Sequence, residues 1–131
     1  MDSVNADKVA VRRKWSKGQQ RKTRRHAGQD IDTPERDRRR EELLRPWPTL
    51  GYEHDQIAMH LISREAFKVA EAELRRAVWL NPYEARFKVH LAWCLCREKR
   101  FTEAREWIEQ VPPECMVETV ANIKRVIEEG T

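Results

Sequence analysis

The sequence predicts an all-α protein whose helices come in pairs, and two observations support this fold class. The first is an internal repeat, in which apolar and small residues recur at a fixed offset of 34 residues. The matched pairs are Ile57 and Leu91, Ala58 and Ala92, Leu61 and Leu95, Phe67 and Phe101, Ala70 and Ala104, Leu74 and Ile108, and Ala77 and Val111. The second is the placing of prolines and capping residues, which divide the repeated stretch into segments of helix length. Together they predict stacked helix–turn–helix units.

Each expected helix has recognisable ends. Thr33-Pro34-Glu35 combines a capping hydroxyl, a proline in the first turn and an acidic residue near the positive helix end, so a helix should run over 35–45 until Pro46 stops it. Four more helices are expected over 52–63, 67–80, 85–98 and 102–110. A last, amphipathic helix over 116–129 places apolar residues on one face. These residues are Val117, Val120, Ile123, Val126 and Ile127.

Residues 51 to about 118 resemble tetratricopeptide repeats. The resemblance rests on the 34-residue period, on the recurring alanines, and on the Asn81-Pro82 junction followed by Ala85. It implies a short array of two helix–turn–helix units, with the final helix as a cap. Two departures are His54 and Lys88, which stand where the family often has an aromatic residue. Because at least three units are usually needed for stability, the missing packing is expected from the 35–45 helix, a second copy or a partner.

Charge divides the chain into an arm, a connector and a repeat domain. Residues 1–47 hold 14 Lys/Arg against 8 Asp/Glu, whereas residues 48–131 hold 12 against 14. We therefore expect a basic arm over 1–32, disordered or ordered on a partner, a short helix and Pro-Trp-Pro connector over 33–47, and the repeat domain over 48–131. Trp47 is expected to pack on the neighbouring domain, with a partner contact as the alternative.

The arm is extended and suits an anionic partner. Its candidate contact residues are Lys8, Arg12, Arg13, Lys14, Trp15, Lys17, Arg21, Lys22, Arg24 and Arg25. Phosphates of RNA or DNA, an anionic membrane face and an acidic protein subunit would each attract it. A solvated tail and a transit peptide are the remaining alternatives.

The family's geometry implies a groove lined by the first helix of each unit. The residues expected to face it are Tyr52, Asp55, Met59, Ile62, Ser63, Arg86, Val89, Trp93, Cys96 and Arg97. Family members that clamp the C-terminal carboxylates of heat-shock chaperones use Lys, Asn and Arg at most of these places, so the present residues imply that this clamp is absent. A mostly apolar groove suits an amphipathic helix or hydrophobic peptide, or the chain's own Leu43-Leu44 segment or Trp47.

Catalytic, cofactor and metal chemistry have little support in the sequence. Cys94 and Cys96 stand two apart and so point to roughly opposite sides of a helix, which predicts one buried and one groove-facing thiol rather than a metal site. The histidines have no zincin-like arrangement, and no glycine-rich phosphate loop is present. An odd cysteine count, no apolar leader and no long apolar run favour a cytoplasmic location, with the cytoplasmic face of a membrane complex as a variant.

We therefore expect a non-enzymatic protein-binding adaptor or peripheral subunit of a larger assembly, which docks through its groove and basic arm. A homo-oligomer is compatible with the short array. The alternative is a nucleic-acid- or ribosome-associated factor led by the arm.

Overall fold

The computed structural model describes residues 34–131, and this part of the chain is helical without strands. Its helices are α3 (Pro34–Leu44), α4 (Tyr52–Ser63), α5 (Phe67–Leu80), α6 (Ala85–Arg97), α7 (Phe101–Ile108) and α8 (Val117–Gly130). The prediction of an all-α fold is confirmed for these residues, and the predicted helix ends lie within two residues of the observed ones. The arm residues predicted between Lys8 and Arg25 lie outside the described part.

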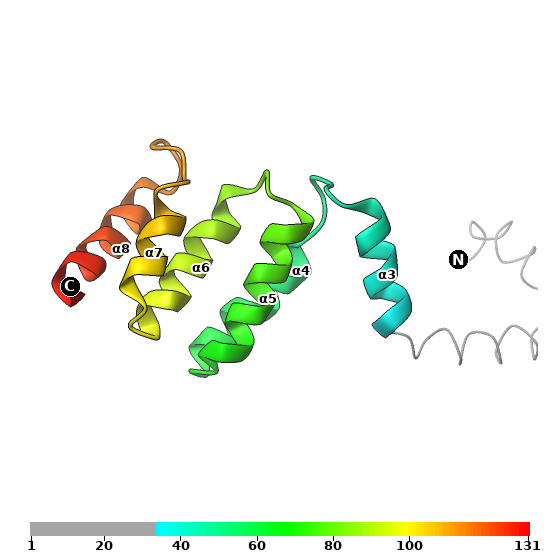
Figure 1. The fold of residues 1–131 in the computed structure, drawn as a ribbon, viewed down its shortest axis with the longest axis horizontal. Coiled ribbons are helices and arrows are strands. Elements are labelled where there is room, and N and C mark those ends of the chain that lie inside the picture. Colours follow the sequence, from blue (N-terminus) through cyan, green and yellow to red (C-terminus); the bar gives the residue numbers. More distant parts are fainter. Residues whose placement is uncertain (1–33) are drawn as a thin grey trace, which may run out of the picture. The chain divides into compact units, whose positions relative to one another are not determined.

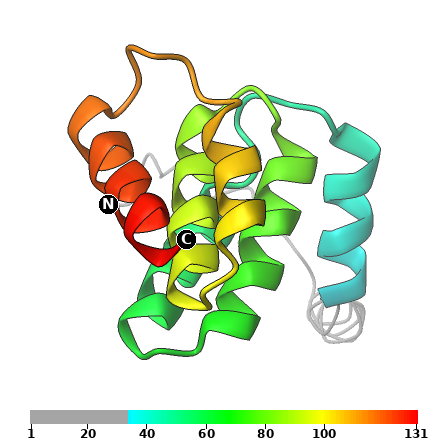
Figure 2. The same ribbon diagram turned by 60° about the vertical axis from the view of Figure 1, so that its left-hand side comes forward.

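Helices α4 to α8 belong to one compact unit, Glu41–Thr131. Each of these helices packs against the next, and α6 also contacts α4 and α8. This pattern places α4, α6 and α8 in one layer and α5 and α7 in the other (Figures 1 and 2). The central helix α6 therefore has neighbours on several sides, which explains why most of its apolar residues are buried.

The turns that join α4 to α5 and α6 to α7 share one geometry. Glu65 (φ 63°) and Lys99 (φ 62°) both adopt the left-handed backbone conformation, and they stand in the same position of the sequence repeat. The residue after each of them donates its backbone N–H to the carbonyl oxygen of Leu61 or Leu95, at 2.9 Å in both cases. These bonds satisfy carbonyl groups that a helix end leaves open. The two helical hairpins therefore share the same turn conformation and the same closing hydrogen bond.

Alanines lie at the most buried positions of both hairpins. Ala58, Ala70, Ala92 and Ala104 are each 0% exposed and belong to one core cluster. A methyl side chain lets two helix backbones approach closely, and larger residues such as Leu74 then fill the spaces beside the contact. The repeated alanines thus set the distance between helices.

The connector before α4 is fixed to the end of α5 by Asn81. This buried side chain donates from Nδ2 to the carbonyl oxygens of Pro48 and Leu50, at 3.0 Å each. The backbone N–H of Trp47 donates to the carbonyl oxygen of Leu80 at 3.2 Å. The indole of Trp47 nevertheless stays 50% exposed. The connector thus docks on the end of α5 through its backbone, and the packing predicted for the indole of Trp47 stays a prediction.

The last turn of α3 is held by charge rather than by apolar packing. Glu41 accepts a hydrogen bond from Arg76 at 3.1 Å, and its other oxygen lies 2.9 Å from Nε2 of His54. Nδ1 of His54 lies 2.7 Å from Glu73 of α5. His54 thus joins carboxylates from two helices.

Helix α8 covers α6 and α7 with one apolar face. Ile123 and Ile127 are buried, and Val120 and Val126 pack at the margin of the core. Val117, predicted on the same face, is 58% exposed because it opens the helix before the chain reaches the core.

An ionic cluster links α5 to the turn between α6 and α7. Arg100 donates to Glu71 at 2.7 Å, to Glu98 at 3.2 Å and to Glu103 at 2.7 Å, and Arg75 donates to Glu71 at 2.8 Å. Burial, together with the hydrogen bond to Glu71, raises the pKa of Glu98. The hydrogen bond from Arg100 lowers the pKa of the exposed Glu103. Three carboxylates thus share two guanidinium groups. Burial disfavours the anions of both Glu71 and Glu98, but hydrogen bonds from Arg75 and Arg100 outweigh it at Glu71, whose pKa is lowered.

The helix contacts can be tested by overpacking. Ala70→Leu or Ala104→Leu should lower the free energy of unfolding by roughly 1–3 kcal/mol, because extra methylenes cannot fit between closely packed helices. Urea unfolding measures this change. Ala72→Leu, at an exposed position of α5, is the matched control and should change stability by less than about 0.5 kcal/mol. Equal losses at positions 70 and 72 would contradict the packing described.

The ionic cluster makes a prediction about pH. Because the pKa of Glu98 is raised in the folded chain, its contribution favours the fold at low pH and is lost as the pH rises through that value. Glu98→Gln should therefore raise the melting temperature at neutral pH, and the gain should shrink as the solution becomes acidic. Glu103→Gln should act in the opposite direction at neutral pH, since the pKa of Glu103 is lowered. Melting curves across pH 4–8 that show the same sign for both variants would refute this assignment.

Candidate partner-binding groove

A cavity of about 380 Å³ opens on the layer formed by α4, α6 and α8. Four of its lining side chains are apolar and three can form hydrogen bonds. They are Met59, Trp93, Met116 and Ile123, and His90, Thr119 and Asn122. A pocket of this size with an apolar floor and a few polar groups suits a ligand side chain or short apolar segment.

The register of the helices brings these side chains together. His90 and Trp93 are three residues apart and lie on the same face of α6. Thr119 and Asn122 have the same spacing on α8, beside the buried Ile123. Because α4 and α8 both pack on α6, the three helices contribute to one surface.

A buried acidic residue orients His90 at the edge of the cavity. Asp55 of α4 is 5% exposed, and its Oδ1 lies 2.6 Å from Nδ1 of His90. A carboxylate removed from water needs such a partner, so the pair also ties α4 to α6. With Nδ1 engaged, Nε2 is the ring nitrogen that a bound group can reach.

Part of the predicted groove is present as expected. Met59 and Trp93 line the cavity together. Arg97 lies with its Cζ 5.7 Å from the ring centre of Trp93, and also 4.9 Å from that of Phe67. These contacts place Arg97 beside the cavity rather than within its lining.

Tyr52 and Arg86 form a separate group with Glu84. The Cζ of Arg86 lies 5.4 Å from the ring centre of Tyr52. The hydroxyl of Tyr52 donates to Glu84, and this bond raises the pKa of Tyr52 and lowers that of Glu84. Neither Tyr52 nor Arg86 lines the cavity.

The remaining predicted groove residues are buried. Val89 is 0% exposed, Cys96 4%, Asp55 5% and Ile62 6%. Family geometry assigned them to the open side of the first helices, but α6 packs against both α4 and α8, and these residues are buried within that packing. The prediction that Cys96 faces the groove is therefore wrong, and burial raises its pKa to about 11. Because they are buried, these residues cannot meet a partner directly.

Five of the lining residues were not predicted from the sequence, and one feature of the sequence points to two of them. Thr119 and Asn122 flank the apolar face of the predicted last helix, but the sequence did not reveal which way that face turns over α6. The Leu43-Leu44 segment, one proposed occupant, is largely exposed, and neither it nor Trp47 lines the cavity.

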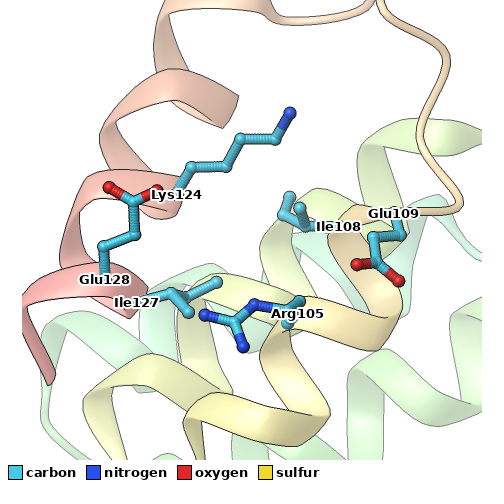
Figure 3. Close-up of a pocket in the computed structure, with 6 residues that line it drawn as sticks. All are labelled: Arg105, Ile108, Glu109, Lys124, Ile127 and Glu128. Carbon is cyan, nitrogen blue, oxygen red and sulfur yellow. The ribbon is translucent and has the colours of Figure 1, made fainter. Parts of the chain in front are cut away.

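A second cavity of about 190 Å³ lies between α7 and α8 (Figure 3). Ile108 and Ile127 face each other across it, and four charged side chains surround them. These are Arg105, Glu109, Lys124 and Glu128, all exposed. Two positive and two negative groups on flexible, solvated side chains leave no net preference for one kind of ligand.

The thiols and ionisable groups of the described residues give little basis for chemistry. Burial raises the pKa of Cys94 to about 12, so its thiol stays protonated at neutral pH. Within residues 34–131, no three His, Cys, Asp or Glu side chains gather as a metal site. In the same range, every helix is too short or too polar to cross a membrane.

Comparisons with protein-family models, curated proteins and solved structures find no match to the chain.

Proposed function

We propose that this chain is a non-enzymatic adaptor of the tetratricopeptide type, which holds a partner protein in the groove of α4, α6 and α8. The observation that carries the proposal is the cavity of about 380 Å³, in which apolar side chains from three helices meet a few hydrogen-bonding groups. The repeated turns at Glu65 and Lys99 support the family assignment, because they recur with the sequence period. A peripheral subunit of a larger assembly, in the cytoplasm, is the role that fits these features.

The chemistry of the groove favours an amphipathic helix or hydrophobic segment as its ligand. Met59 and Met116 are unbranched and polarisable, so they can adapt to an inserted aliphatic or aromatic side chain. Trp93 offers a large contact area, and residues of this type often dominate binding energy. His90, Thr119 and Asn122 can then hydrogen-bond to polar groups beside the anchor.

The groove can be tested with paired substitutions on α8. Thr119→Arg places a long charged side chain at the mouth of the cavity, whereas Ala121→Arg makes the same change at an exposed position that does not line it. The full chain and both variants serve as baits in nuclease-treated extracts, followed by quantitative mass spectrometry. We expect a stoichiometric protein partner to bind the wild type and Ala121→Arg and to be lost from Thr119→Arg.

A substitution in the floor measures the strength of the anchor contact. Trp93→Ala should weaken the interaction with the recovered partner by roughly 30-fold or more, since a central aromatic contact is often worth about 2 kcal/mol. Titration calorimetry with the purified partner measures this, with little change in salt dependence expected. If no partner is recovered, or if Thr119→Arg and Ala121→Arg behave alike, the groove is not the binding site.

A further inference from the structure

A second surface with different chemistry lies where the connector meets the end of α5. Three aromatic side chains are exposed there: Trp47 by 50%, Trp79 by 42% and Tyr83 by 66%. They come from one small region, since Asn81 bonds both to the connector and to the backbone N–H of Tyr83, at 3.2 Å. We call Arg45, Trp47, Trp79 and Tyr83 the aromatic edge.

Within the aromatic edge, Trp79 is held by two guanidinium groups. Arg45 donates from Nε to the carbonyl oxygen of Trp79 at 3.0 Å, and its Cζ lies 4.1 Å from the indole centre. Arg76 supports the same indole at 5.1 Å. Among the described residues, the side chains of Trp47 and Tyr83 make no hydrogen bond or ring contact, and half or more of each is exposed to a ligand.

The charge near this surface indicates which class of ligand it favours. Arg76 is paired with Glu41 and Glu42, at 3.1 and 3.5 Å, but no carboxylate in the described part pairs with Arg45. The sequence that leads into the aromatic edge is strongly basic, with 14 Lys/Arg against 8 Asp/Glu in residues 1–47. A partner should therefore combine flat rings with repeated negative charge.

We propose that the aromatic edge binds single-stranded nucleic acid, with bases stacked on Trp47 and Tyr83 and a phosphate drawn by Arg45. The net positive charge of residues 1–47 adds long-range attraction to the phosphates. Stacking on aromatic and guanidinium planes needs unpaired bases, because a duplex keeps its bases stacked on one another. The site goes beyond the protein-binding groove and shares no residue with its lining.

The test is binding of the full chain to a fluorescently labelled, unstructured RNA of about 12 nucleotides, followed by anisotropy. Trp47→Ala and Tyr83→Ala should each weaken binding by roughly 5- to 150-fold, which is the effect of losing one stacked base. Trp47→Phe and Tyr83→Phe keep an aromatic plane and should retain most of the affinity. Val69→Ala, an equally exposed apolar position on α5, should have no effect.

Salt and strand structure distinguish stacking from simple charge attraction. Deleting residues 1–32 should flatten the dependence of affinity on salt, whereas the two aromatic-to-alanine variants should lower affinity and leave the slope unchanged. A duplex of the same sequence should bind more weakly than the single strand. Circular dichroism confirms that each variant is folded, as expected for side chains that are half exposed or more.

Several outcomes would overturn the proposal. Absence of saturable RNA binding, equal affinity for duplex and single strand, or unchanged binding by the Trp47 and Tyr83 alanine variants would each do so. Loss of a co-purifying protein from these variants, with RNA binding intact, would show a protein interface instead. Thr119→Arg should bind RNA normally, so failure of the groove proposal and failure of this one can be told apart.

Discussion

Close approach of helix backbones is the constraint on which the rest of the structure depends. Ala58, Ala70, Ala92 and Ala104 are fully buried, and any larger residue at these positions would push neighbouring helices apart. The left-handed turns at Glu65 and Lys99 reverse the chain tightly enough for the alanines to meet. Because both hairpins use the same spacing, α4 and α6 lie in one layer, and α8 can join them. The groove is a consequence of this layering.

The central helix α6 makes many of the contacts that fix this arrangement. Phe87, Leu91 and Leu95 are all 0% exposed, so α6 has little apolar surface left over. Polar contacts then fix its position relative to its neighbours: Asp55 binds His90 from α4, and the ionic cluster around Arg100 joins its C-terminal turn to α5. Apolar packing is largely non-directional, whereas hydrogen bonds demand a defined geometry. These polar contacts therefore fix the orientation of α6 relative to its neighbours.

The sequence predicts the helices well and the site only in part. Helix ends follow from local signals such as Pro46 and the Asn81-Pro82 junction, which act within a few residues. Exposure depends on tertiary packing, so the family's pattern misassigned Val89 and Cys96 to an open surface that α8 covers. Met59 and Trp93 were found because they lie nearer the margin of that contact. The aromatic edge was not predicted because its residues come from segments that are brought together by tertiary hydrogen bonds of Arg45, Trp47 and Asn81.

The two proposed surfaces rely on different physical forces, which makes simultaneous occupation feasible. The groove is mostly apolar and lies on α4, α6 and α8, so binding there should depend weakly on salt. The aromatic edge lies at the end of α5 and the connector and includes Arg45, which pairs with no carboxylate within residues 34–131, so its ligand should respond strongly to salt. The two sites share no residue, so a ligand on one does not occupy the other. A chain with these two surfaces could hold a protein and a nucleic acid at once, and in that arrangement the helical core would act as the rigid spacer between them.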